Sequence, residues 1–203
     1  GGLLLIIGSL FYLASCKKDP EQPTTPPVKP PDTPAVYVPI HQPGDTVNFG
    51  AGYAKKLTAD WSAEVYSKVM NFVDTSYISV SFFTYSKTDI NEQRESLSFY
   101  FIPKPSIGQL LLLKYMTSAS IKPGYISTVY TTWRSDGDVI EDRYDLDETA
   151  PDNYFKLTKA DWAKKRVEGT FTASFKIQEP RVNPLNPKQV KFSNGRFWAN
   201  IQD

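Results

Sequence analysis

Cysteine and histidine are nearly absent from this sequence. Its 203 residues include one Cys and one His, and 23 Lys and Arg against 22 Asp and Glu give a formal net charge of +1. The single Cys excludes a disulfide framework and a cysteine-based zinc site. The single His, His41, excludes a metal site built from several histidines. A charge so close to neutral argues against a nucleic-acid-binding protein, which would carry clustered Lys and Arg.

Motifs for cofactor binding and covalent catalysis are lacking as well. The sequence has no Gly-x-Ser-x-Gly elbow and no glycine-rich phosphate loop, so we expect no cofactor. Paired carboxylates could still serve a glycosidase, but the 22 acidic residues are spread over turns and strand edges. We therefore expect a protein that is not an enzyme.

The composition nevertheless suits a folded protein. Hydrophobic residues make up 40% of the chain, which is enough to form the core of one large domain or two small ones. The pattern along the chain divides it into three zones, residues 1–15, 16–45 and 46–203.

Residues 1–15 resemble the hydrophobic part of a secretory signal peptide. The apolar run from Leu3 to Leu13 is shorter than the roughly 20 apolar residues that a membrane-spanning helix needs. Its length fits the h-region of a signal peptide. The starting Met and the cationic n-region of such a signal are not in the sequence, and we expect that they precede Gly1.

The motif Leu13-Ala14-Ser15-Cys16 follows this run directly and resembles the lipobox of bacterial lipoproteins. The resemblance implies cleavage before Cys16, a diacylglycerol thioether on its thiol and acylation of its new amino group, with palmitate among the acyl chains. Two or three acyl chains anchor a protein stably, because each buried methylene contributes about 0.8 kcal/mol. The alternative is an ordinary buried Cys after an apolar strand.

Proline dominates residues 16–45. Nine of the sixteen prolines fall between Pro20 and Pro43, and this density excludes a helix or a central strand, because proline lacks a backbone donor and favours extended neighbours. We expect a disordered, semi-rigid linker of roughly 3 Å per residue that holds the folded domain off the membrane. The alternative is a proline-rich ligand for an SH3-like partner.

The residues after Cys16 bear on the location of the protein. Lys17-Lys18-Asp19 with Glu21 partly resembles the charged tag that directs lipoproteins of Bacteroidota to the cell surface. The residue after Cys16 is Lys rather than Asp, so the inner-membrane retention signal of enterobacterial lipoproteins is absent. The resemblance implies a lipid-anchored outer-membrane protein at the cell surface, with the periplasmic face as the alternative.

Residues 46–203 have the pattern of an all-β domain. Residues 77–85 combine β-branched and aromatic residues with period-two alternation, which is typical of a strand. The turn Ser135-Asp136-Gly137-Asp138 should join two strands in a hairpin. Further strands are expected at residues 61–66, 96–102, 125–133, 139–144, 153–157, 167–177 and 190–201. Their spacing predicts an antiparallel β-sandwich or open barrel.

Three segments of this domain admit more than one interpretation. Trp61, Val65 and Val69 share a helical face, although we favour a strand there. The apolar run at residues 107–113 is best explained by a buried central strand, with an exposed patch for a partner protein as the alternative. Gly169 and Asn194-Gly195 interrupt strand patterns and indicate bulges, turns or a close approach of the backbone.

The stretch from Tyr154 to Ala199 resembles the C-terminal half of lipoproteins of Bacteroidota whose domain has no assigned function. The matching motifs are Val167-Glu168-Gly169-Thr170-Phe171 and Asn194-Gly195-Arg196-Phe197, and the likeness is looser over residues 61–112. The resemblance implies a β-rich domain of the cell envelope and no particular chemistry.

Acidic residues cluster after the expected strand at 125–133. Asp136, Asp138 and Asp142 are candidate calcium ligands, because calcium takes six to eight oxygen ligands. Their spacing departs from the EF-hand loop, which has Gly at its sixth position and Glu at its twelfth. The alternative is a solvated turn and strand, so we expect no metal site beyond this candidate.

Aromatic residues, at 14% of the chain, supply the candidate ligand-binding residues. Trp133 and Trp198 lie near expected strand ends, where an exposed indole can stack on a sugar ring, and Arg134 adjoins the first of them. The alternative is that each Trp fills the core. We expect a non-catalytic domain that binds a glycan or another extracellular ligand. The alternative is a structural or accessory subunit that docks onto an outer-membrane protein complex.

Overall fold

The computed structural model describes residues 49–72, 75–89, 91–104, 107–114, 121–122 and 124–203. This part of the chain is all-β, as predicted, and contains no helix. Its ten strands are β1 (Gly50–Lys56), β2 (Ala59–Phe72), β3 (Thr75–Tyr85), β4 (Gln93–Pro103), β5 (Gly108–Leu113), β6 (Tyr125–Trp133), β7 (Ile140–Leu146), β8 (Tyr154–Asp161), β9 (Arg166–Ile177) and β10 (Gln189–Gln202).

The ten strands form one sheet that closes on itself. The pairings run from β1 through β2, β3, β4, β6, β7, β9 and β10, and β10 pairs with β1 again. β5 and β8 provide a second path between β6 and β9. All neighbours are antiparallel except two short parallel contacts, β5 with β6 and β10 with β2. Closure satisfies the backbone groups that would otherwise be unpaired at sheet edges.

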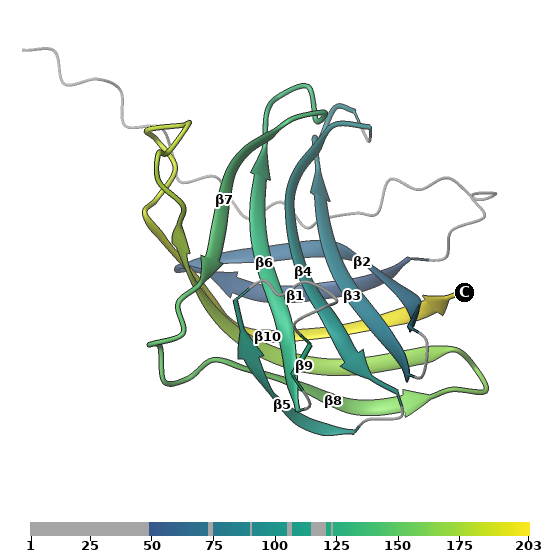
Figure 1. Cartoon of the computed structure of the whole chain (residues 1–203). Coiled ribbons are helices and arrows are strands. Elements are labelled where there is room, and N and C mark those ends of the chain that lie inside the picture. Colours follow the sequence, from purple (N-terminus) through teal and green to yellow (C-terminus); the bar gives the residue numbers. More distant parts are fainter. Residues whose placement is uncertain (1–48, 73–74, 90, 105–106, 115–120, 123) are drawn as a thin grey trace, which may run out of the picture. The chain divides into compact units, whose positions relative to one another are not determined.

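The closed sheet has two layers that face each other across the core. In Figure 1, β3, β4, β6 and β7 run upright, whereas β1, β2, β8, β9 and β10 cross them. Such crossing is the orthogonal mode of packing, in which strands pass between layers by bending or by bulges. Here the long strand β2 connects the two layers, because its first half pairs with β1 and its second half pairs with β3.

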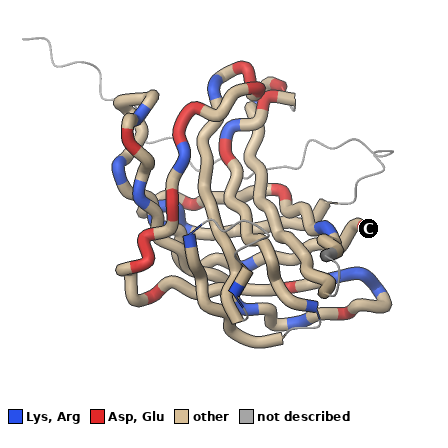
Figure 2. Tube along the Cα trace, in the orientation of Figure 1, with Lys and Arg blue, Asp and Glu red and all other residues tan. Residues whose placement is uncertain are grey.

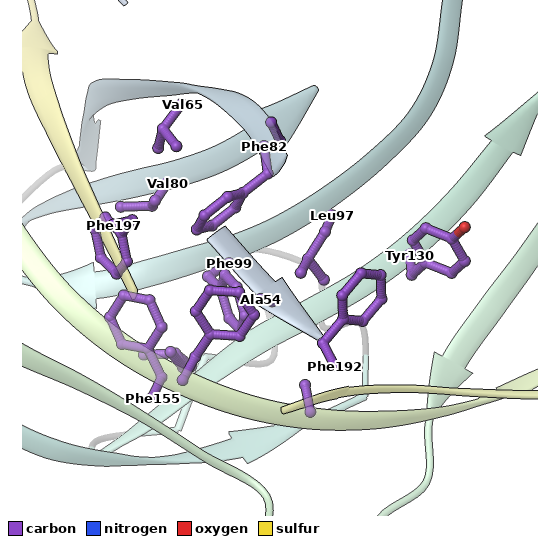
Figure 3. Close-up of a cluster of buried hydrophobic side chains, with 14 of the residues drawn as sticks. Ala54, Val65, Val80, Phe82, Leu97, Phe99, Tyr130, Phe155, Phe192 and Phe197 are labelled. Atoms are coloured by element: carbon purple, nitrogen blue, oxygen red, sulfur yellow. The ribbon is translucent and has the colours of Figure 1, made fainter. Parts of the chain in front are cut away.

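Phenylalanine rings fill the centre of the core. Phe82, Phe99, Phe155 and Phe197 come from four different strands and point toward one another (Figure 3). The ring centroids of Phe99 and Phe155 are 4.7 Å apart, and those of Phe155 and Phe197 are 5.5 Å apart. Phe171, which is fully buried, lies 5.0 Å from Phe82. Tilted rings at these distances stabilise a core beyond the area that they bury.

Most of the strands expected from the sequence are present. β6 has the expected bounds, residues 125–133, and pairs with β7 across a turn in which Gly137 has a φ of 75°. Trp61 belongs to a strand, β2, rather than to a helix. The expected hairpin of residues 153–157 with 167–177 is confirmed as β8 and β9. β1 was not expected, since its sequence is short and rich in Gly, Ala and Lys.

The interpretation of residues 107–113 as a buried strand is wrong in part. β5 lies between β6 and β8, as a central strand does. However, Ile107 is 68% exposed and Leu111 is 50% exposed, whereas Leu112 is 8% exposed. One face of β5 therefore meets the core and the other meets solvent, because the sheet is closed and has a single interior.

Two glycine motifs behave as the sequence indicates. A Cβ on Gly169 would lie 2.6 Å from the backbone oxygen of Lys156 and 2.6 Å from the ring of Phe197, so the backbone approaches its neighbours closely there. At Asn194-Gly195 the register of β10 shifts against β9, and Asn194 has a φ of 54°. A Cβ on Gly195 would lie 2.6 Å from the ring of Phe171, so both glycines allow a close approach that a side chain would prevent.

Residues 1–48 lie outside the described residues. The signal peptide, the Cys16 lipidation site, the proline-rich linker and His41 therefore remain predictions from the sequence. The described residues include no helix that could span a membrane.

Candidate functional site

A shallow groove of about 340 Å³ lies on the outer surface of the closed sheet. It crosses β1, β10, β9 and β8. The lining residues are Ala51, Tyr53, Thr158, Arg166, Glu168, Gly169, Thr170, Arg196, Phe197 and Trp198. Tyr53 is 47% exposed, so a large aromatic side chain is accessible to a ligand at this surface.

Strand alternation explains why these side chains gather there. On β10, Phe197 is 5% exposed and faces the core, so Arg196 and Trp198 on either side of it face outward. On β9, Val167 is fully buried and Gly169 is also buried, and Glu168 and Thr170 face outward for the same reason.

The register of four strands aligns the outward residues in two rows. In the first row, Ala51 is opposite Trp198, and Trp198 is opposite Glu168. In the second row, Tyr53 is opposite Arg196, Arg196 is opposite Thr170, and Thr170 is opposite Lys156.

A bulge completes the groove on β8. The pairing of β8 with β9 shifts between Leu157 and Lys159, so Thr158 is the extra residue of the bulged strand. A bulge re-aims the side chain that it carries, and Thr158 lines the groove. Its hydroxyl, like that of Thr170, adds a hydrogen-bonding group beside the aromatic and charged residues of the groove.

Two arginines lie over the two outward-facing aromatic rings of the groove, those of Trp198 and Tyr53. The guanidinium carbon of Arg166 is 4.5 Å from the ring centre of Trp198, and that of Arg196 is 5.5 Å from the ring centre of Tyr53. A guanidinium over a ring face is attracted by the ring quadrupole, and its N–H groups remain available to donate hydrogen bonds at the ring's edge. The groove thus offers apolar ring surface beside planar hydrogen-bond donors.

One carboxylate, that of Glu168, lines the groove. Its Oε1 lies 3.3 Å from Nε of Arg166 and 3.8 Å from Nζ of Lys159. Arg196, in contrast, has no ion pair within the described part of the chain. Both arginines thus stack on an aromatic ring, but only Arg166 is also paired with a carboxylate among the described residues.

Of the residues predicted to bind a ligand, the groove contains Trp198 and neither Trp133 nor Arg134. Trp133 ends β6, which does not pair with β10, and its Nε1 lies 3.4 Å from Oγ of Ser96. Arg134 begins the turn after β6, where its backbone oxygen accepts a hydrogen bond from Nη1 of Arg94 at 3.1 Å. The predicted pair of tryptophans is thus divided between different parts of the sheet.

Tyr53, Arg166 and Arg196 were not predicted. Arg196 could have been found, because the alternation in Arg196-Phe197-Trp198 places its side chain on the same face as that of Trp198. Tyr53 and Arg166 reach the groove through the pairing of β1 and β9 with β10, and no local pattern reveals that pairing.

The candidate calcium ligands have structural roles. Asp142 is 3% exposed, and its carboxylate accepts hydrogen bonds from the backbone N–H of Val182 at 2.7 Å, from that of Asn183 at 3.2 Å and from Nδ2 of Asn186 at 2.7 Å. Burial alone would raise the pKa of Asp142, but these bonds outweigh it and lower the pKa. Asp136 instead accepts a hydrogen bond from the N–H of Asp138 within its own turn, at 3.2 Å. Among the described residues, no group of three His, Cys, Asp or Glu is placed to hold a metal ion.

A second charged cluster lies inside the sheet around Glu95. One carboxylate oxygen, Oε1, binds Nζ of Lys56 and accepts a hydrogen bond from the Tyr130 hydroxyl at 2.8 Å. The other, Oε2, accepts one from Nε1 of Trp61 at 2.7 Å. Burial by itself raises the pKa of Glu95, but the charge of Lys56 and the three hydrogen bonds more than offset it and lower the pKa. Both oxygens of the Glu95 carboxylate thus have partners from other strands, and we infer that this cluster stabilises the fold at one end of the core.

Comparisons of the chain with protein-family models, with curated proteins and with solved structures found no match. The likeness of residues 154–199 to lipoproteins of Bacteroidota therefore stays an expectation from the sequence.

Proposed function

We propose that this chain is a lipid-anchored protein of the bacterial outer membrane whose β-domain binds a glycan or another extracellular ligand without catalysis. The groove around Trp198 carries this proposal. It combines two outward-facing aromatic rings, two guanidinium groups and the hydroxyls of Thr158 and Thr170 on one open surface. The ring surface that the guanidinium groups leave open can contact the apolar faces of sugars, and the polar groups can bind sugar hydroxyls.

Charge placement supports binding rather than hydrolysis. A glycosidase uses two carboxyl groups, about 5–10 Å apart, on either side of the scissile bond. Glu168 is the one carboxylate among the described residues that line the groove, and it is paired with two cations.

Binding is tested by electrophoresis of the protein through gels that contain a soluble polysaccharide. The panel consists of neutral polymers (dextran, xylan, galactomannan) and acidic polymers (polygalacturonate, hyaluronan, chondroitin sulfate). At least one polymer should retard the protein, and Trp198→Ala should abolish the retardation. Trp133→Ala is the matched control and should leave it unchanged. No retardation by any polymer, or equal loss in both variants, would contradict the proposal.

The membrane anchor rests on the lipobox and is tested separately. Cys16→Ala should leave the protein without lipid and release it from the membrane fraction. Protease treatment of intact cells should digest residues 49–203 while a periplasmic control protein stays intact. Retention of the variant on membranes would contradict lipid anchoring, and protection of the domain would place it on the periplasmic face.

Docking onto an outer-membrane protein complex is the second candidate, and one surface favours it. Leu185 is 91% exposed and Val182 is 56% exposed in the loop between β9 and β10, and Ile140 at the start of β7 is 47% exposed. The Asp142 carboxylate fastens this loop to β7, so the apolar side chains are held in place. Leu185→Asp should reduce cross-linking of the protein to an envelope partner in cells. Unchanged cross-linking would argue against docking through this loop.

A further inference from the structure

The groove has an excess of positive charge. Arg166 and Arg196 line it and Glu168 is its carboxylate. Beside the groove, Lys159 and Lys156 add two cations, and Asp161 and Glu64, which are opposite Arg166 and Ala51, add two acidic residues, so the excess comes from the lining residues themselves. In Figure 2, Asp and Glu alternate with Lys and Arg along β7 and the upper loops, whereas Lys and Arg predominate in the turn between β8 and β9. Arg166 begins β9 directly after Lys164 and Lys165 of that turn.

Among the cations of this groove, Arg196 is the one best placed to bind an anionic group of a ligand. It is exposed, it stacks on Tyr53 at 5.5 Å, and it has no ion pair with any described residue. Stacking restricts the planar guanidinium, and a restricted guanidinium loses less entropy when it binds a second group. The group that matches its fork of N–H donors is a carboxylate or a sulfate, bound by two parallel hydrogen bonds.

Arg166 complements this arrangement. Its contact with Glu168, at 3.3 Å from Nε, fixes the guanidinium over Trp198 at 4.5 Å. The charge of Arg166 is therefore largely compensated within the protein, and that of Arg196 is not. A bound neutral sugar would leave the charge of Arg196 uncompensated, whereas the anionic group of an acidic sugar would pair with it.

We propose that the ligand of this groove is an acidic glycan, whose carboxylate or sulfate pairs with Arg196 while its sugar rings contact Tyr53 and Trp198. This inference rests on the proposed function, since it specifies the ligand of the same site. The groove then selects for charge through Arg196 and for sugar surface through the aromatic rings.

Gel retardation with matched polymers separates a preference for acidic glycans from glycan binding in general. Polygalacturonate is compared with its methyl ester, which keeps the backbone and removes the charge. Chondroitin sulfate is compared with desulfated chondroitin, and dextran sulfate with dextran. The first pair tests the carboxylate and the other two test the sulfate. At least one charged polymer should bind about tenfold more tightly than its matched uncharged or less charged form, and added salt should reduce the difference.

Two variants of equal charge change locate the effect. Arg196→Gln should abolish the preference for the charged polymer, and Arg134→Gln, at an exposed position outside the groove, should preserve it. Equal binding within every pair, no effect of Arg196→Gln, or equal effects of the two variants would overturn the acidic-glycan inference and leave the proposed function standing. Failure of every polymer to retard the protein would overturn both.

Discussion

Replacing Glu95 with Gln is expected to destabilise the domain strongly. The carboxylate joins Lys56 on β1, Trp61 on β2 and Tyr130 on β6, so it links both layers of the sheet. Gln can still accept hydrogen bonds but cannot balance the charge of Lys56, whose side chain is 23% exposed. Breaking a buried ion pair costs about 3–5 kcal/mol, and the partial exposure of Lys56 lowers our expectation to about 2–3 kcal/mol.

Denaturation in urea measures this loss. The midpoint of unfolding should shift to lower urea with an unchanged slope. Asp60→Asn is the matched control, because Asp60 on β2 pairs with Lys55 on β1 at 2.6 Å, next to Lys56 in the chain, but their side chains are 59% and 45% exposed. That variant should lose less than about 1 kcal/mol. Equal stability of the two variants would refute the role of Glu95 in holding the layers together.

The same residue predicts a dependence on pH. The pKa of Glu95 is lower in the folded protein than its ordinary value, so the folded state binds the proton less readily than the unfolded state. Its contribution is therefore complete above the unfolded pKa, about 4.3, and is lost as the pH falls through the folded pKa. The stability difference between the protein and Glu95→Gln should shrink in acid, and a constant difference down to pH 3 would contradict the assignment.

Three other substitutions test the core packing of Phe171, the close backbone approach at Gly169 and the loop that Asp142 holds. Phe171→Ala should lower the unfolding free energy by about 3–5 kcal/mol in urea, because the ring is fully buried beside Phe82 and Phe99; a loss below 1 kcal/mol would contradict the packing. Gly169→Ala should cost about 1–3 kcal/mol in the same assay, since its Cβ would lie 2.6 Å from a backbone oxygen, and a neutral effect would show that the close approach is absent. Asp142→Ala should speed amide exchange at Val182, whose N–H donates to that carboxylate at 2.7 Å, and unchanged exchange would argue against the anchored loop.

Local patterns in the sequence predict strands well in this protein because alternation is a short-range property. Residues 125–133 alternate and end at a turn with Gly, and β6 has those bounds. β1 escapes prediction because its Gly and Ala residues carry little β-propensity, and its place in the sheet depends on pairing with β2 and β10. The apolar run of β5 suggests burial on both faces, but a closed sheet has one interior.

The candidate site was predictable only in part, because strand pairing brings together residues that are distant in the sequence. Trp198 was identified as an exposed aromatic near a strand end, and it lines the groove. Its neighbours Tyr53 and Arg166 are distant in the sequence and reach it through strand register. Register depends on long-range packing and on bulges such as the one at Asn194-Gly195, and a single sequence does not reveal it.

The most direct test of the account follows the four tryptophan indole N–H signals by NMR. The protein with 15N-labelled Trp is titrated with oligogalacturonate and with chondroitin sulfate oligosaccharides. The signal of Trp198, assigned from Trp198→Phe, should move with at least one of them, whereas those of Trp61, Trp133 and Trp162 should stay. Movement at Trp133 alone, or no movement at Trp198 with either ligand, would contradict the groove as the binding site.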